Sequence, residues 1–156
     1  MSIQLFAYQQ EAAKYVISDL THHKRSLLVM ATGTGKTHTA LGILDHFLQS
    51  DPYKRVLILS HRREILDQWE MVISQVFNHD VNAFPSLEDL VYTCTFQRAW
   101  NLLQNDTLST LSFDYVIVDE AHHSQATTFK QVLEHLHYDW ILGLTATPDR
   151  LDGANI

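Results

Sequence analysis

The feature that most restricts the fold is a glycine-containing loop between two apolar stretches. Residues 26–30 form an aliphatic run, residues 31–37 read Ala-Thr-Gly-Thr-Gly-Lys-Thr, and residues 37–48 then carry apolar side chains at helical spacing. A strand, a glycine loop and a helix in this order form the context that a phosphate-binding loop requires. Gly33 and Gly35 let backbone NH groups turn inward, and the N-terminus of the helix favours an anion.

The side chains of this loop predict a nucleotide rather than a simple anion. Lys36 can reach the β- and γ-phosphates, and the Thr37 hydroxyl can ligate Mg²⁺. The general pattern has a further glycine where this chain has Met30, whereas the Gly-Lys-Thr end is intact. The alternative is a glycine-rich turn that caps an ordinary helix, which the strand and helix on either side disfavour. The other members of the predicted cradle are Thr32, Gly33, Thr34 and Gly35.

Short aliphatic runs alternate with helical patterns along the chain. The candidate strands after the first are residues 56–60, 90–95, 115–118 and 141–144. The candidate helices are residues 5–20, 37–48, 64–77 and 126–136. Such alternation predicts an α/β fold with a mainly parallel sheet covered by helices on both faces. We expect a single domain over residues 1–156, with ligands at the carboxyl ends of the strands.

An acidic pair, Asp119 and Glu120, directly follows the aliphatic run at residues 115–118. Beside a phosphate loop, Asp119 can hold Mg²⁺ and Glu120 can orient and deprotonate an attacking water. A solvated turn that caps the next helix is the alternative, and the presence of the Lys36 loop disfavours it. We reject a zinc site at His122 and His123, because adjacent residues rarely present both rings to one ion and no third ligand is identifiable.

Composition limits the partners that the chain can have. The net charge of −7 is unfavourable for nucleic-acid binding, although a protein that grips phosphates through loop NH groups and a few local side chains need not be basic. No apolar run approaches the roughly 20 residues that span a bilayer, so we expect no membrane partner and a cytoplasmic location. Cys94 is the only cysteine, which excludes a disulfide within the chain and a cysteine-based zinc site.

Taken in order, these motifs resemble those of superfamily 2 helicases and translocases, in particular the branch with restriction-enzyme motor subunits and the UvrB-like and DEAH-type proteins. Residues 30–37 resemble motif I, residues 119–122 resemble motif II, and residues 144–148 resemble motif III. The resemblance implies a three-layer α/β/α RecA-like domain that binds ATP and Mg²⁺. It also implies that motif III links the ATP state to the grip on nucleic acid. The implied coupling residues are His122, Thr145, Ala146 and Thr147.

Other segments resemble the parts of the family that contact the nucleic-acid backbone and recognise adenine. Residues 56–69 are similar to motif Ia, and residues 95–97 lie where a further backbone-contacting motif is expected. The candidate nucleic-acid contacts are Arg62, Arg63, Thr95 and Arg98, with a solvated helix start as the alternative. Residues 5–9 resemble the adenine-reading segment, in which the Gln9 amide pairs with adenine N6 and N7. Gln10 is an alternative to Gln9, and Phe6 stands where many relatives carry arginine.

The resemblance implies the ATP-binding half of a nucleic-acid-dependent ATPase, either a helicase or a translocase, with DNA favoured over RNA. The family builds its ATPase site between two RecA-like domains, and we expect the second to be absent from this chain. An arginine finger from that domain contributes roughly 10³- to 10⁵-fold in turnover. We therefore expect this chain to bind Mg²⁺-nucleotide and to hydrolyse it slowly. The alternatives are a non-catalytic nucleotide-binding switch or interaction module, and a phosphate-loop kinase or GTPase.

Overall fold

The centre of the protein is one five-stranded parallel sheet. The computed structural model describes residues 3–31, 35–77, 91–106, 112–121 and 127–146. The strand order is β1-β5-β4-β2-β3, and all four neighbouring pairs are parallel. The strands are β1 (Arg25–Met30), β2 (Val56–Ser60), β3 (Val91–Thr95), β4 (Tyr115–Asp119) and β5 (Trp140–Ala146). The predicted parallel α/β fold is confirmed.

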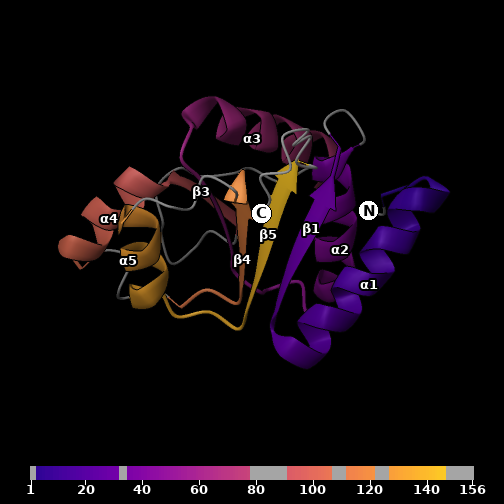
Figure 1. Ribbon diagram of the computed structural model, residues 1–156, viewed down its shortest axis with the longest axis horizontal. Helices are drawn as coiled ribbons and strands as arrows, with labels where there is room; N and C mark the ends of the chain where they lie inside the picture. The colour runs from indigo at the N-terminus through magenta and orange to yellow at the C-terminus, as the bar shows by residue number, and fades with distance from the viewer. Residues whose placement is uncertain (1–2, 32–34, 78–90, 107–111, 122–126, 147–156) are drawn as a thin grey trace, which may run out of the picture.

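Helices cover both faces of this sheet and make three layers (Figure 1). The helices are α1 (Ala7–His23), α2 (Lys36–Ser50), α3 (Arg63–Phe77), α4 (Phe96–Gln104) and α5 (Thr127–His135). Helices α1, α2 and α3 share one apolar cluster with the sheet. Helices α4 and α5 share the other, on the opposite face. No helix among the described residues is long and apolar enough to cross a membrane.

The alternation of side chains along the central strands explains the two clusters. In β2, Val56 and Ile58 belong to the cluster with α1, α2 and α3, whereas Leu57 and Leu59 belong to the cluster with α4 and α5. Successive strand residues point to opposite faces, so a strand that is aliphatic throughout must be buried on both sides. All five residues of β2 are buried. The fully buried runs at β2 and β4 therefore mark the middle of the sheet, whereas β1 lies at its edge and leaves Leu27 and Val29 exposed.

The register of the strands brings their carboxyl ends to one edge of the sheet. Met30 pairs with Ala146, Asp119 pairs with Leu144, and Ser60 pairs with Thr95. In open parallel sheets, ligands bind outside this edge. The phosphate loop, the acidic pair, motif III and the start of α3 thus leave the sheet on the same side.

Three details differ from the prediction. Helix α4 was not among the predicted helices, although its buried side chains follow helical spacing. The sheet extends further than the aliphatic runs, because Asp119 ends β4, and Thr145 and Ala146 belong to β5 rather than to the segment after it. The backbone hydrogen bonds of the ladder continue past the last aliphatic side chain, which an apolarity pattern does not reveal.

Candidate nucleotide-binding site

The described part of the phosphate loop is its last residue, Gly35, which precedes α2. Gly35 has a φ of 82°, in the left-handed region, and its carbonyl accepts hydrogen bonds from the backbone NH and the hydroxyl of Thr39, both at 2.9 Å. A Cβ at this position would collide with Nε2 of Gln9. The left-handed backbone conformation therefore favours glycine here, and any Cβ would also require the end of the Gln9 side chain to move. Thr32, Gly33 and Thr34 lie outside the described residues.

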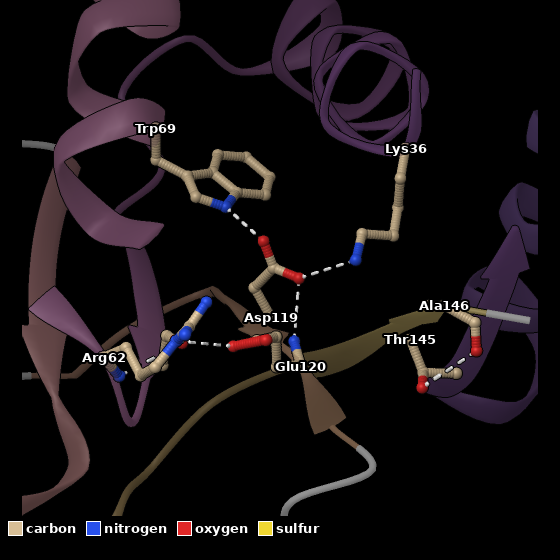
Figure 2. Close-up of polar contacts among 8 residues, drawn as sticks. Lys36, Arg62, Trp69, Asp119, Glu120, Thr145 and Ala146 are labelled. Carbon is tan, nitrogen blue, oxygen red and sulfur yellow. Dashed lines mark hydrogen bonds and ion pairs between the residues drawn. The ribbon is translucent and has the colours of Figure 1, made fainter. Parts of the chain in front are cut away.

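Asp119, at the end of β4, is held by groups from three parts of the chain (Figure 2). Lys36 Nζ lies 3.1 Å from Oδ1, and the backbone NH of Glu120 donates to Oδ1 at 2.7 Å. The indole Nε1 of Trp69 donates to Oδ2 at 2.8 Å. The Asp119 side chain is only 5% exposed, and burying a carboxylate without such partners is strongly unfavourable. Lys36 and Asp119 therefore form a preorganised charge pair between α2 and β4.

Glu120 combines a strained backbone with an incompletely bonded carboxylate. Its φ is 57°, a conformation that costs about 1–2 kcal/mol for a residue with a side chain and that is typical of functional sites. Oε2 lies 3.3 Å from Nε of Arg62, but no hydrogen bond of acceptable geometry reaches this buried oxygen from the described residues. The contact with Arg62 is therefore one of charge, and Oε2 is a buried acceptor without a hydrogen bond from the described residues.

A cavity of about 470 Å³ lies where these groups meet. Its lining includes Gly35, Lys36, Thr37, Arg62, Asp119 and Glu120. The described residues contain no cluster of three histidine, cysteine or carboxylate side chains that could cage a metal. Mg²⁺ in nucleotide sites needs no such cage, because it keeps several waters and binds one or two protein oxygens plus phosphate oxygens. The Thr37 hydroxyl and the Asp119 carboxylate fit this ligand set.

The two candidate adenine readers are in different environments. Gln9 is 4% exposed, its Oε1 accepts the backbone NH of Phe6 at 2.9 Å, and its Nε2 faces Gly35. Gln10 is exposed, and its Nε2 donates to the backbone carbonyl of Leu5 at 2.9 Å. Only Gln9 thus lies against the phosphate loop. Phe6 and Tyr8 flank it on the surface as a stacked pair, with centroids 6.1 Å apart.

The residues that were predicted to contact nucleic acid do not form one cluster of free cations. Arg62 faces Glu120, across the cavity from Lys36. Arg63 pairs with Asp67, at 3.0 Å, and with Glu70, both on its own helix α3. Burial acts to lower the pKa of Arg63, but hydrogen bonds and charge interactions with Asp67 and Glu70 outweigh it, so the pKa is raised. Arg62 and Arg63 thus both pair with carboxylates of this chain.

Thr95 and Arg98 lie at the start of α4, beside the end of β3. The Thr95 hydroxyl caps the helix by accepting the backbone NH of Arg98 at 3.2 Å. Burial raises the pKa of the neighbouring Cys94 thiol to about 12, against the lowering effect of the Arg98 and Arg63 charges. The positive charges of Arg63 and Arg98 are therefore both close enough to the end of β3 to affect Cys94. Because its thiol stays protonated and buried, Cys94 is an inert part of the core.

Motif III is described only in part. Thr145 is 8% exposed, and its hydroxyl lies 3.4 Å from the carbonyl oxygen of Ala146, which lines the cavity. His122 and Thr147 lie outside the described residues. The role predicted for these four residues stays a prediction.

The sequence placed Trp69 in the segment similar to motif Ia but did not connect it with the nucleotide site. Its position fits the apolar stripe of α3, and a tryptophan in such a stripe is usually a core residue. The signal that could have revealed it is chemical, because a buried indole NH usually has an acceptor, although the sequence does not show that this acceptor is Asp119.

A second, larger cavity lies at the opposite edge of the sheet. It has a volume of about 560 Å³, and its lining includes Lys24, Arg25 and Ile141, at the starts of β1 and β5. None of the predicted site residues that the structure describes lines it. Because parallel sheets bind ligands at the carboxyl ends of their strands, the smaller cavity is the candidate site.

Comparison with known proteins agrees with this geometry. The sequence matches the family described as "Type III restriction enzyme, res subunit" over residues 2–150. It is 30% identical over 150 residues to putative helicase 109L of Invertebrate iridescent virus 3, covering 88% of this chain and 43% of that protein. It is 29% identical over 158 residues to DNA 3'-5' translocase XPB2 of Sulfurisphaera tokodaii, covering 97% of this chain and 32% of the relative. The chain thus spans less than half of either relative.

A solved structure shares the fold. The SWI2/SNF2 ATPase core of Sulfolobus solfataricus in complex with dsDNA superposes with a TM-score of 0.78 over 97% of this chain and 34% of that one, at 21% sequence identity. At this identity the likeness establishes the architecture. Together with the family match, it leads to one assignment. The chain belongs to the family of the type III restriction enzyme res subunit, as an N-terminal RecA-like domain of the superfamily 2 helicase type.

Proposed function

We propose that this chain binds Mg²⁺-ATP in the cavity between the phosphate loop and Asp119. The observation that carries the proposal is the 3.1 Å pair between Lys36 and Asp119, two side chains from separate elements that meet at the carboxyl edge of the sheet. A phosphate group entering beside Lys36 would meet a cation already held in place. Mg²⁺ would replace that cation as the partner of the carboxylate.

Each predicted residue has a role within this proposal. The backbone NH groups of Thr32, Gly33, Thr34 and Gly35 would cradle phosphates, and Lys36 would bind their oxygens. Thr37 and Asp119 would hold Mg²⁺, which neutralises charge on the phosphates. Glu120 would orient and deprotonate the attacking water. Gln9 would read the adenine through its amide.

The complete protein would couple ATP hydrolysis to movement on nucleic acid. A second RecA-like domain would close the site and supply an arginine finger, and the short span of the chain along its relatives supports this division. His122, Thr145, Ala146 and Thr147 would transmit the ATP state. By itself, the chain would bind nucleotide and hydrolyse it slowly.

We favour DNA over RNA as the nucleic acid along which the complete protein would move. The archaeal relative is described as a DNA translocase, and the matching ATPase core was solved with dsDNA. Arg62, Arg63, Thr95 and Arg98 would contact phosphates beyond the ends of β2 and β3. Arg62 and Arg63 would first have to leave their carboxylate partners.

The test is binding of a fluorescent ATP analogue to the chain with Mg²⁺, measured by anisotropy. Lys36→Ala should weaken binding by about 100-fold, because it removes the ammonium that would bind the phosphate oxygens. Lys14→Ala, at an exposed position on α1, is the matched control and should bind as the wild type does. No binding by the wild type would favour the non-catalytic interaction module instead.

A further inference from the structure

The most informative contact outside the predicted motif roles is the hydrogen bond between α3 and the end of β4. Trp69 is 1% exposed, and its Nε1 donates to Oδ2 of Asp119 at 2.8 Å. The other oxygen, Oδ1, receives Lys36 and the backbone NH of Glu120. The two oxygens of Asp119 therefore have separate partners, one set facing the cavity and one facing the core (Figure 2).

This division fixes the rotation of the carboxylate. The torsion about the bond to an aspartate carboxylate has a broad minimum, so the side chain itself does not set which oxygen faces a metal. An indole offers a single NH in one direction, and close packing holds the Trp69 ring in place. Its hydrogen bond ties Oδ2 to the core and turns Oδ1 toward Lys36.

We propose that Trp69 is a positioning residue for metal binding, which holds the Asp119 carboxylate so that Oδ1 faces Mg²⁺ in the nucleotide site. The inference rests on the proposed function, because it assigns a support to the same metal ligand. Partners that orient a metal ligand typically contribute 10- to 100-fold in metal affinity. Trp69 would therefore act through Asp119, without touching metal or nucleotide.

The position of Trp69 on α3 supports this role. Ile65, Gln68 and Val72 of the same helix line the nucleotide cavity, and they lie within one turn of Trp69. Trp69 is thus on the part of α3 that forms a wall of the site, and its indole NH reaches the carboxylate of Asp119 from there.

A second tryptophan provides a matched comparison. Trp140, on β5, is also 1% exposed, but its Nε1 has no hydrogen-bond partner among the described residues. Its ring stacks on Tyr115, with centroids 4.4 Å apart. Trp140 is therefore buried through apolar and ring contacts, without a hydrogen bond to its NH from the described residues. Replacing each tryptophan by phenylalanine removes an NH and some volume in both cases, but only Trp69→Phe removes a bond to Asp119.

The experiment compares Trp69→Phe and Trp140→Phe in this chain. Affinity for the fluorescent ATP analogue is measured with excess Mg²⁺ and with EDTA, and the ratio gives the gain from the metal. We expect Trp69→Phe to reduce that gain by about 10-fold, with the affinity in EDTA changed by less than about twofold. Trp140→Phe should leave the gain unchanged. An unchanged gain in Trp69→Phe, or an equal loss in both variants, would overturn the inference.

A spectroscopic measurement covers the case in which Trp69→Phe does not fold. The chain has three tryptophans, so the double variant W100F/W140F leaves Trp69 as the only one. Adding Mg²⁺ and nucleotide should change its emission, because the metal alters the charge on its acceptor, whereas Asp119→Asn should abolish the change. A constant emission in a double variant that binds nucleotide would refute the role. If the wild type binds no nucleotide, the proposed function fails and this inference falls with it.

Discussion

The two halves of the carboxyl edge of the sheet hold their charges in different ways. Beyond β1, β5 and β4, charged and polar groups from α2, α3 and β4 converge on Asp119. Beyond β2 and β3, Arg63 pairs with Asp67 and Glu70 on its own helix, and Glu70 also accepts the hydroxyl of Thr93. In the first half, the groups that contact Asp119 come from separate elements of the fold. In the second half, Arg63 and its carboxylate partners all belong to α3, and Thr93 of β3 adds one hydrogen bond.

The difference concerns what an incoming phosphate must displace. In the nucleotide half, a phosphate would meet Lys36, whose only partner among the described residues is Asp119, the carboxylate that we propose as a ligand of Mg²⁺. In the other half, a phosphate must compete with two carboxylates for Arg63. Because the chain carries a net charge of −7, nucleic-acid binding by this half alone should be weak and sensitive to salt.

The largest expected effect separates the two adjacent carboxylates of the nucleotide half. Asp119→Ala should reduce affinity for the Mg²⁺-bound ATP analogue by about 100-fold, because it removes the metal ligand. Glu120→Gln should change affinity by less than about twofold, because a water-activating base contributes to turnover rather than to binding. Titration of both variants by anisotropy checks the difference.

Thermal unfolding of the two variants is the control for misfolding. In a protein completed with its second domain, Glu120→Gln should block turnover while binding persists. Equal loss of binding in both variants would show that the roles of the two carboxylates are misassigned.

A smaller effect is expected where arginine is held by its own helix. Glu70→Gln removes a negative competitor for Arg63 and should raise affinity for a short DNA duplex at low salt by about threefold, whereas Arg63→Ala should lower it and reduce the salt slope by about one. Glu134→Gln, exposed on α5, changes the net charge equally and is the control. If Glu70→Gln and Glu134→Gln raise affinity alike, the effect is one of net charge and the pairing at Arg63 is irrelevant.

The smallest effect concerns the helix cap at the end of β3. Thr95→Ala removes the acceptor for the Arg98 backbone NH, a loss of about 1 kcal/mol, which corresponds to a decrease in Tm of about 2–4 °C. Thr95→Ser keeps the hydroxyl and should restore the Tm in differential scanning fluorimetry. A Tm that is unaffected by Thr95→Ala would leave phosphate contact as the only role for this hydroxyl.

The fold was predictable because buried parallel strands and their covering helices leave a pattern of apolar residues. The exception is α4, which begins at the residue directly after β3, so no turn residues separate the two elements in the sequence. The ends of β4 and β5 were also misjudged. Asp119 and Thr145 are buried polar residues within strands, and their burial depends on partners that are distant in the sequence.

The roles proposed for Gly35, Lys36 and Thr37 stay predictions, but their place at one cavity was predictable, because they follow one another in the sequence. The contacts of Trp69 and Arg62 were not, because the direction in which a long side chain reaches is set by the packing of α3 against β4. Arg62 was expected to point toward nucleic acid, and its approach to Glu120 is visible only in the folded chain.

The close approach of Gln9 to Gly35 has a consequence for how the nucleotide site can be altered. Any side chain at Gly35 must push away the amide that is proposed to read the base. Gly35, proposed to bind phosphate, and Gln9, proposed to bind the base, are therefore in direct contact. A bulkier residue at position 9 would press on Gly35, so we expect a change made there for base selectivity to alter affinity for phosphate as well.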